Sequence, residues 1–360
     1  MTDLEAPAPR GKGLLASPGV WLGLGVSVVC LWLAFRQVPF SALGAALSQA
    51  DYWWLIPAIG VHLLAIWARA ARWETLLRAR GILADAFWAQ SVGFLFTNAF
   101  PLRMGEPARV VALAGRARLP LMRVAASAIV ERMLDVGTVL ALLVLALPWM
   151  DVPPVVLRAG LVFAGVLIAG ALGLALLVRM QDRTEAVLRR LIKRLRLPVD
   201  GLMGRWREIV DGLRPLGHSA TALRSLGWSV LVWALYVGFY WCVLRAFRPD
   251  PTPVEATFMV VALALAISVP SSPGFIGVYQ LAGQQALSLP FGARYDPSTA
   301  LAVTLVSHLV YYLVTSVLGA VGLARTGASF AELGRTIVSR SARGNPAQAA
   351  DSSHEEARNG

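Results

Sequence analysis

The sequence predicts an all-α integral membrane protein with about six spanning helices and two further broken or re-entrant helical segments. Three observations support this fold class. Of the 360 residues, 57% are hydrophobic and 15% are charged, and the mean hydropathy is +0.61. Soluble chains carry about a quarter charged residues. Several apolar runs also reach the roughly 20 residues that cross a bilayer core of about 30 Å.

Spanning helices are expected wherever such a run is continuous. The predicted spans, in chain order, are 18–36, 51–71, 122–148, 156–180, 222–247 and 298–323. Two other apolar segments, 82–100 and 254–290, are interrupted: the first ends at Pro101, and the second contains "SVPSSPGFIG". Irregular backbone at membrane depth is tolerated only where protein buries it or where it lines an aqueous cavity. These two segments are therefore predicted to be broken or re-entrant.

The net charge of +12 reflects arginines gathered in loops between the apolar runs. This pattern follows the positive-inside rule and does not indicate a nucleic-acid-binding surface. It places the N-terminal segment 1–17, the basic loop 181–221 and the polar tail 326–360 in the cytoplasm, with the membrane domain at 18–325. The tail is expected to be disordered. Arg245 and Arg248 are exceptions, because this topology places them outside.

The two interrupted segments share a short pattern. Pro101 and Gly105 bracket the first P-x-x-x-G, and Pro270 and Gly274 bracket the second. In the predicted topology the two segments enter the membrane from opposite sides. Paired Gly/Pro-interrupted segments in opposed halves favour an inverted-repeat transporter. Chance similarity is the alternative, since Pro and Gly are common in membrane helices.

Loop 181–221 contains "LRRLIKRLRL", which mixes aliphatic residues with arginine. One interpretation is an amphipathic helix that lies on anionic lipid headgroups. The other is a solvated linker helix that is basic only because of its topology.

Charges inside the predicted third span are informative because each is costly at membrane depth. Glu131, Arg132 and Asp135 fall in its cytoplasmic half, and Glu131 and Asp135 share a helix face. They should face the bundle interior and meet partners or a wet cavity. The alternative is a structural knot of ion pairs that only holds helices together.

The stretch "FTNAFPLRMGEPARVV" at 96–111 places helix breakers beside charges. Pro101 and Pro107 remove backbone donors and Gly105 admits unusual dihedrals, so the chain is not expected to stay helical here. Arginine forks bind phosphate, which lipid headgroups offer. The residues predicted to line a cavity are Asn98, Arg103, Glu106 and Arg109. A basic cytoplasmic loop without a site is the alternative.

"NAFPLRMGEPARVVAL", "VERMLD" and "VPSSPGFIGVYQ" occur in this order, and "RAARWETLLRA" tips the second span. Together they resemble the lysylphosphatidylglycerol synthase transmembrane-region family of flippase-like membrane proteins, over about residues 18–325. The resemblance implies movement of amino-acylated or glycosylated lipids between leaflets. The implied headgroup-binding residues are Arg69, Arg72, Asn98, Arg103, Glu106, Arg109, Glu131, Arg132, Asp135 and Gln280. The implied helix breaks or hinges are Pro101, Gly105, Pro107, Pro270, Pro273, Gly274 and Gly277.

Two departures from the family pattern affect the expected substrate and activity. Many members have a carboxylate where this chain has Gln280, so a cationic headgroup would lose one counter-charge there. The bifunctional synthases also carry a large soluble domain after the membrane region, whereas this chain ends shortly after its last predicted span. Aminoacyl transfer is therefore not expected.

We expect a flippase or transporter of the bacterial inner membrane, which moves a phospholipid, aminoacyl-lipid or glycolipid. The alternative is a non-transporting scaffold or accessory subunit for a lipid- or glycan-modifying enzyme. Enzyme activity is not expected, because His62 and His308 stand alone and Ser271 and Ser272 lack a positioned base.

No cofactor or metal is expected, since the two cysteines, Cys30 and Cys242, lie in apolar runs without metal-type spacing. The expected partners are lipids with phosphate-bearing headgroups and the anionic lipid surface at loop 181–221, with no nucleic acid. A homo-oligomer is left open.

Overall fold

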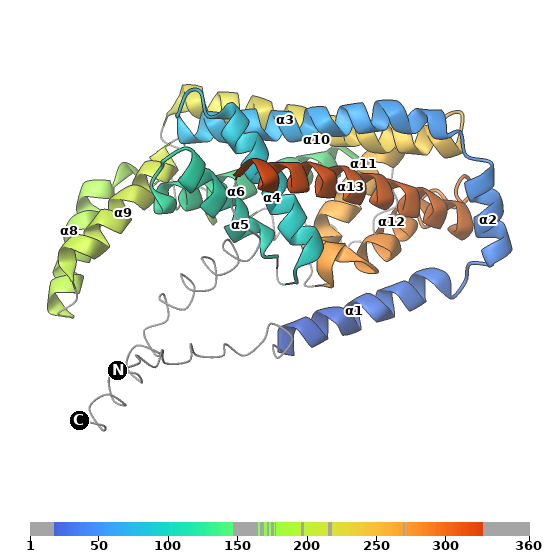
Figure 1. Cartoon of the computed structure of the whole chain (residues 1–360), viewed down its shortest axis with the longest axis horizontal. Helices are drawn as coiled ribbons and strands as arrows, with labels where there is room; N and C mark the ends of the chain where they lie inside the picture. Colours follow the sequence, from blue (N-terminus) through green and yellow to red (C-terminus); the bar gives the residue numbers. More distant parts are fainter. Residues whose placement is uncertain are drawn as a thin grey trace, which may run out of the picture.

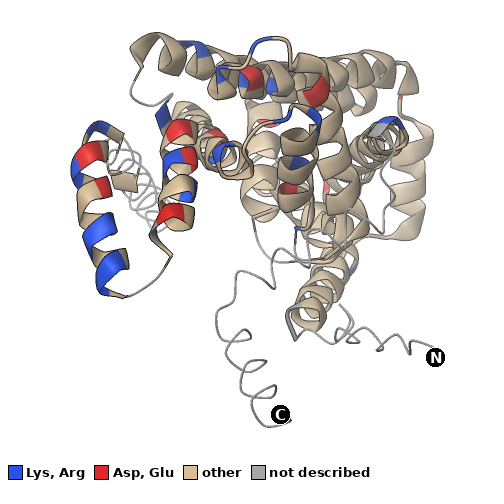
Figure 2. Cartoon of the chain, turned by 60° about the vertical axis from the view of Figure 1, so that its left-hand side comes forward, with Lys and Arg blue, Asp and Glu red and all other residues tan. Residues whose placement is uncertain are grey.

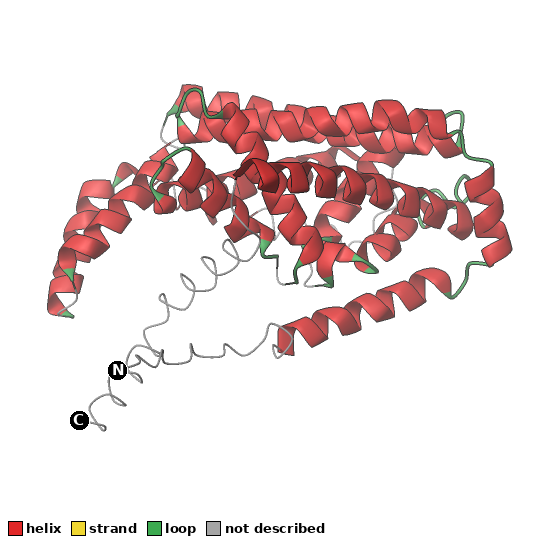
Figure 3. Ribbon diagram, viewed as in Figure 1, coloured by secondary structure: helices red, strands yellow, loops and turns green. Residues whose placement is uncertain are grey.

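The computed structural model describes residues 18–101, 103–146, 178–195, 198–214, 218–268 and 271–326, with single helical positions between 165 and 176. These described residues form α-helices and two short 3-10 turns, with no strand, so the all-helical prediction is confirmed (Figure 3). Segments 1–17 and 327–360, most of the predicted span 156–180, and Pro270 lie outside the described residues.

Three helices are long and apolar enough to cross a membrane: α3 (Leu55–Leu77, preceded by the turn η2, Tyr52–Trp54), α10 (Ser219–Phe247) and α13 (Pro297–Thr326). They match the predicted spans 51–71, 222–247 and 298–323. The predicted span 18–36 is α1 (Pro18–Phe35), which joins α2 (Phe40–Ser48) through an 82° bend. Counted as one span, this bent pair gives up to four candidates in the described part of the chain, so the predicted six are not confirmed.

The predicted span 122–148 is α6 (Leu121–Ala146). It is long enough to span, but every window of membrane length within it contains Glu131, Arg132 and Asp135. Glu131 and Asp135 are buried within the protein. The polarity of α6 therefore belongs to its contacts with neighbouring helices.

Both interrupted segments form helical hairpins, which lie among the long helices (Figure 1). The first pairs α4 (Leu83–Ala99) with α5 (Gly105–Arg116). The second pairs α11 (Pro253–Ala266) with α12 (Val278–Ser288), with the turn η5 (Pro273–Phe275) at its tip. At 1.5 Å per residue, α4 and α11 are only about 25 and 21 Å long, shorter than a bilayer core of about 30 Å.

The two hairpin tips meet each other. The Arg103 guanidinium of the first tip donates to the carbonyl oxygen of Ile267, which follows α11. The Tyr312 hydroxyl of α13 donates to the carbonyl oxygen of Asn98 at 3.4 Å. Gly274 of the second tip lies against this same pair of groups. The meeting point lies between the two ends of the long helices (Figure 1).

The order long helix, hairpin, long helix occurs twice, as α3–α4–α5–α6 and as α10–α11–α12–α13. The helices α3 and α10 are antiparallel neighbours: the amide of Asp51, before α3, donates to the carbonyl of Ala246 at the end of α10, at 2.7 Å. Their contact uses small residues of α3, Ala58 and Ala68, which allow close approach. Across the two units, α4 packs on α13 and α11 packs on α6.

Backbone geometry at the tips tests the predicted breaks. Pro101 directly follows the end of α4, and Pro273 begins η5. Gly274 and Gly277 have φ of 66° and 92°, which side chains rarely adopt. The prediction for Pro107 was wrong. It lies in the first turn of α5, where a backbone N–H has no helical partner, so proline does not interrupt the helix.

Gly105 serves close packing and does not act as a break, because it is the first residue of α5. A Cβ there would overlap Thr97 and the carbonyl of Gly93 on α4. The absence of a side chain therefore lets the two arms of the first hairpin touch.

Loop 181–221 contains two helices, and the single amphipathic helix predicted there was wrong. These are α8 (Gln181–Arg194) and α9 (Val199–Leu213). Pro198 separates them, because a residue before proline avoids the helical conformation. The helix α9 packs on α6, and α8 packs on α9. The pair projects from the end of the bundle where α3 ends and α10 begins, and runs steeply across the long helices (Figures 1 and 2).

Candidate functional site

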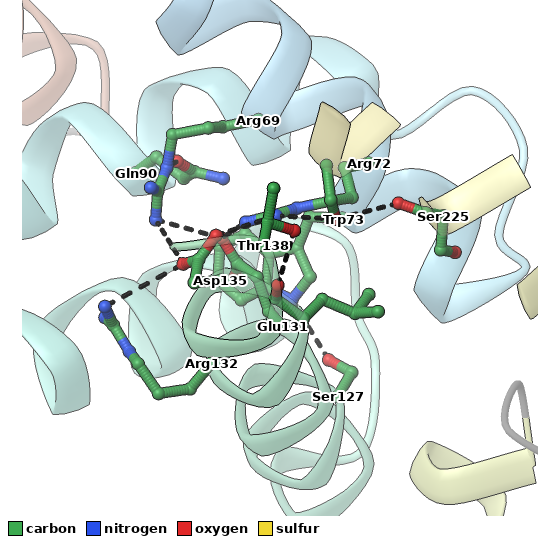
Figure 4. Close-up of polar contacts among 12 residues, drawn as sticks. Arg69, Arg72, Trp73, Gln90, Ser127, Glu131, Arg132, Asp135, Thr138 and Ser225 are labelled. Carbon is green, nitrogen blue, oxygen red and sulfur yellow. Dashed lines mark hydrogen bonds and ion pairs between the residues drawn. The ribbon is translucent and has the colours of Figure 1, made fainter. Parts of the chain in front are cut away.

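A cluster of buried ion pairs joins α3 to α6 (Figure 4). Arg69 and Arg72 lie one turn apart on α3, and Glu131 and Asp135 lie one turn apart on α6, so each pair presents its charges to the other helix. The Arg72 guanidinium donates to Glu131 at 2.9 Å and to Asp135 at 2.8 Å. Arg69 donates to Glu131 at 3.0 Å.

Glu131 is the centre of this cluster. Its second carboxylate oxygen accepts from Arg109 of α5 at 2.6 Å, so one carboxylate contacts three guanidinium groups from two helices. The side chains of Glu131 and Arg72 are both 0% exposed. A buried charge without partners would be strongly destabilising. The inner part of the cluster therefore satisfies the structural interpretation of the ion pairs.

The outer part of the cluster is open. Glu106, at the start of α5, pairs with Arg109 at 2.8 Å and with Arg132 of α6. The side chains of Arg132 and Glu106 are 49% and 44% exposed. Arg103, at the tip of the first hairpin, is also exposed and has a left-handed backbone with φ of 55°. Such a conformation is uncommon for a residue with a side chain and is found at functional sites.

These outer side chains line a cavity of about 270 Å³. One wall is polar, and its members are Arg69, Gln90, Arg103, Glu106, Arg109, Arg132 and Asp135. The opposite wall is apolar and comes mainly from the C-terminal half of α11, with Val260, Leu263, Ala264, Leu265 and Ile267. Aromatic side chains complete the lining, among them Phe94, Trp233, Tyr236, Tyr240, Phe275, Tyr279 and Tyr311. The cavity is therefore amphipathic, as a lipid is.

Seven of the predicted site and hinge residues line the cavity: Arg69, Arg103, Gly105, Glu106, Arg109, Arg132 and Asp135. Arg72 and Glu131 lie behind this wall and hold its members in place. The sequence pattern thus located one real constellation, with an accessible part and an enclosed part.

Asn98 does not line the cavity as predicted. Its amide nitrogen donates to Thr315 and Ser316 of α13, both at 3.0 Å. Its role in the fold is to join α4 to α13.

Gln280 is also directed away from the cavity. Its side-chain oxygen accepts from the Gly277 amide at 2.7 Å, and its nitrogen lies 2.8 Å from His308 Nδ1. Gln280 therefore stabilises the second hairpin tip.

The sequence analysis missed Gln90 and the aromatic lining. Gln90 of α4 is 2% exposed, lines the cavity and accepts a hydrogen bond from Arg69 at 3.2 Å. A glutamine within an apolar segment was a readable signal. The tyrosines had no such signal, because aromatic residues are frequent in membrane helices.

The family was compared once the site geometry was known. The family model described as "Lysylphosphatidylglycerol synthase TM region" matches residues 20–319. The chain belongs to this family. The match confirms the resemblance seen in the sequence motifs and assigns the chain to a membrane domain linked to lipid-related functions. No curated protein and no solved structure matches the chain.

Replacing Glu131 by alanine should strongly destabilise the protein, because three guanidinium groups would lose their shared carboxylate. Breaking a buried pair in this way costs about 3–5 kcal/mol. Thermal unfolding in detergent should show a large fall in melting temperature. Glu106→Ala is the matched control at the exposed edge, where a pair contributes about 1 kcal/mol or less. Equal shifts for both variants would contradict the division into an enclosed and an open part.

Proposed function

We propose that the protein is a lipid flippase or transporter of the bacterial inner membrane, which moves a lipid with a phosphate-bearing headgroup between leaflets. The amphipathic cavity carries this proposal. Its arginine side chains suit phosphate, because guanidinium forks bind phosphate oxygens in pairs. Its apolar wall on α11 suits the adjoining hydrocarbon. Membership of a lipid-linked membrane family supports the same substrate class.

The position of the cavity supports movement of the substrate. Transporters built from inverted repeats bind substrate near the bilayer midplane, where broken helices meet. Here the cavity lies beside the meeting tips of two hairpins, in two units whose long helices α3 and α10 are antiparallel. We interpret the units as an inverted repeat in which each hairpin enters from one side of the membrane.

The proposed orientation places the α3–α4 and α5–α6 turns in the cytoplasm, together with both termini. The start of α3, the end of α10 and the α12–α13 turn then face the periplasm. The described loops at the cytoplasmic end are rich in arginine, among them Arg78, Arg80, Arg116, Arg118 and Arg123. Arg245, Arg248 and Arg294 lie at the opposite end. Two of them have local partners that reduce the conflict with the positive-inside rule: Arg294 pairs with Glu255 at 2.7 Å, and Arg248 donates to the Arg294 carbonyl.

We also propose that α8 lies on the anionic surface of the cytoplasmic leaflet. Val187, Leu191 and Leu195 form an exposed stripe along one face, whereas Ile192 is buried. Basic residues flank the stripe, namely Arg189, Arg190, Lys193 and Arg194. An exposed apolar stripe beside basic residues matches a membrane-surface helix, and a solvated linker would not need the stripe.

Purified protein in liposomes should accelerate exchange of a phosphate-bearing tracer lipid between leaflets. Arg103→Ala should reduce this rate by about 10-fold or more, since a hydrogen bond to a charged group contributes about 1.5–3 kcal/mol. Arg103→Lys should restore little, because a point charge does not replace the fork. Arg80→Ala is the control: this arginine is also exposed but lies outside the cavity.

Melting temperatures measured beside the exchange rates separate two rival accounts. If activity and melting temperature fall together at Arg103, the cluster is purely structural. If the wild-type protein accelerates exchange of no lipid in a broad panel, the transporter proposal fails and the scaffold is favoured.

Single cysteines should test the orientation in a background that lacks Cys30 and Cys242. Gly115→Cys, near the end of α5, should react with a membrane-impermeant maleimide added from the cytoplasmic side. Leu289→Cys, just after α12, should react from the periplasmic side. Both positions are exposed. Labelling from the same side would refute the inverted arrangement of the hairpins.

An environment-sensitive fluorophore on Leu191→Cys should report burial of α8 in the membrane surface. The emission should shift to the blue in vesicles with about a third anionic phosphatidylglycerol, and the shift should shrink at high salt. The same label on Asp182→Cys, on the opposite side of α8, should not respond. Identical behaviour in neutral phosphatidylcholine vesicles would favour the solvated linker.

A further inference from the structure

The charges around the cavity do not balance among the described residues. Five guanidinium groups meet three carboxylates, which leaves a surplus of two positive charges. The basic members are Arg69, Arg72, Arg103, Arg109 and Arg132, and the acidic members are Glu106, Glu131 and Asp135. At membrane depth, positive charges are expensive unless anions or water compensate them.

The three carboxylates are already engaged. Glu131 serves three arginines, and Glu106 serves Arg109 and Arg132. Asp135 accepts from Arg72 and, at 3.2 Å, from the indole of Trp233. Its second oxygen remains 3.7 Å from Arg69 and 3.8 Å from Arg132. No protein carboxylate is left to neutralise the surplus.

Hydrogen-bond donors are also in excess at the cavity wall. Arg103 has no carboxylate partner and donates to the backbone carbonyl of Ile267. Gln90 is almost fully buried, and its amide nitrogen has no hydrogen-bond partner although its oxygen accepts from Arg69. Buried polar groups are normally satisfied, so an unpartnered donor at a cavity indicates a missing acceptor. Charge and hydrogen bonding thus call for the same ligand chemistry: an anion rich in oxygen acceptors.

We propose that the lipid carried in this cavity has a dianionic phosphate headgroup, a phosphomonoester or a diphosphate, and that cationic aminoacyl headgroups are rejected. This inference rests on the proposed function and narrows its substrate. A phosphomonoester carries about −1.5 to −2 charges at neutral pH and offers three acceptor oxygens. It therefore supplies both what the surplus charge requires and acceptors for Arg103 and Gln90. A phosphodiester supplies half the charge, and an aminoacyl group adds to the surplus.

The structure also changes the reason for doubting a cationic headgroup. The sequence pattern placed that doubt on Gln280, which lies outside the cavity and stabilises the second hairpin tip. The rejection comes from the arginines themselves, which would repel a second cation in a site partly shielded from water.

The experiment compares tracer lipids with identical acyl chains in liposomes of wild-type protein. The headgroups are phosphatidic acid, phosphatidylglycerol, phosphatidylethanolamine and aminoacylated phosphatidylglycerol. The exchange rate should fall in this order, with at least about a 10-fold difference between the first and the third, because charge-assisted bonds to phosphate are the strong ones.

Charge variants at the exposed edge test the cause of the ranking. Arg103→Glu removes the surplus and should abolish the preference for phosphatidic acid over phosphatidylethanolamine. Glu106→Gln raises the surplus and should steepen the ranking. Arg80→Glu makes the same charge change outside the cavity and should leave the ranking unaltered. Melting temperatures near the wild-type value show that these half-exposed positions report recognition and not folding.

Each result decides between the two levels of the proposal. Exchange at equal rates for all four headgroups, or fastest exchange of the aminoacylated lipid, overturns the dianionic substrate while the transporter function stands. No exchange of any lipid overturns the transporter function, and the substrate inference falls with it. A ranking that Arg80→Glu changes as much as Arg103→Glu assigns the selectivity to surface charge and overturns the role of the cavity.

Discussion

The carboxylate of Glu131, shared by three guanidinium groups, is the contact on which the first half of the molecule depends. It joins Arg69 and Arg72 of α3 to Arg109 of α5 at a point closed to solvent. Three cations could not be held together in an apolar bundle without it. It therefore also fixes where α5 lies, and with α5 the position of Glu106 and Arg103 at the cavity edge.

The two units share an outline but differ in chemistry. Side chains of α3, α4, α5 and α6 supply the charges of the cluster, whereas α10 to α13 supply tyrosines, Trp233 and the aliphatic wall of α11. The second hairpin tip is held by neutral contacts, among them Gln280 with His308. A repeated backbone thus builds one cavity with a polar side and an apolar side.

Much of this arrangement could be predicted because its signals are local. The breaks near Pro101 and Pro273, the turn spacing of Glu131 and Asp135, and the paired motifs all appear in short stretches of sequence. The directions of Asn98 and Gln280 could not be predicted, because they depend on α13, which is remote in sequence from Asn98. Pro107 was misread because the same residue ends a helix or begins one according to its position in the first turn. The division of loop 181–221 into α8 and α9 was likewise hidden beneath its uniform basic composition.

The packing of α4 on α13 has a consequence for how the chain is assembled. The arm α4 is too short to span a bilayer, and its tip residue Asn98 finds its side-chain partners on the last described helix. During synthesis, the first hairpin is made long before those partners emerge. Contacts so distant in sequence are slow to form. Stable insertion of the first hairpin must therefore be completed late, when α13 arrives, although the residues that define its tip are translated early.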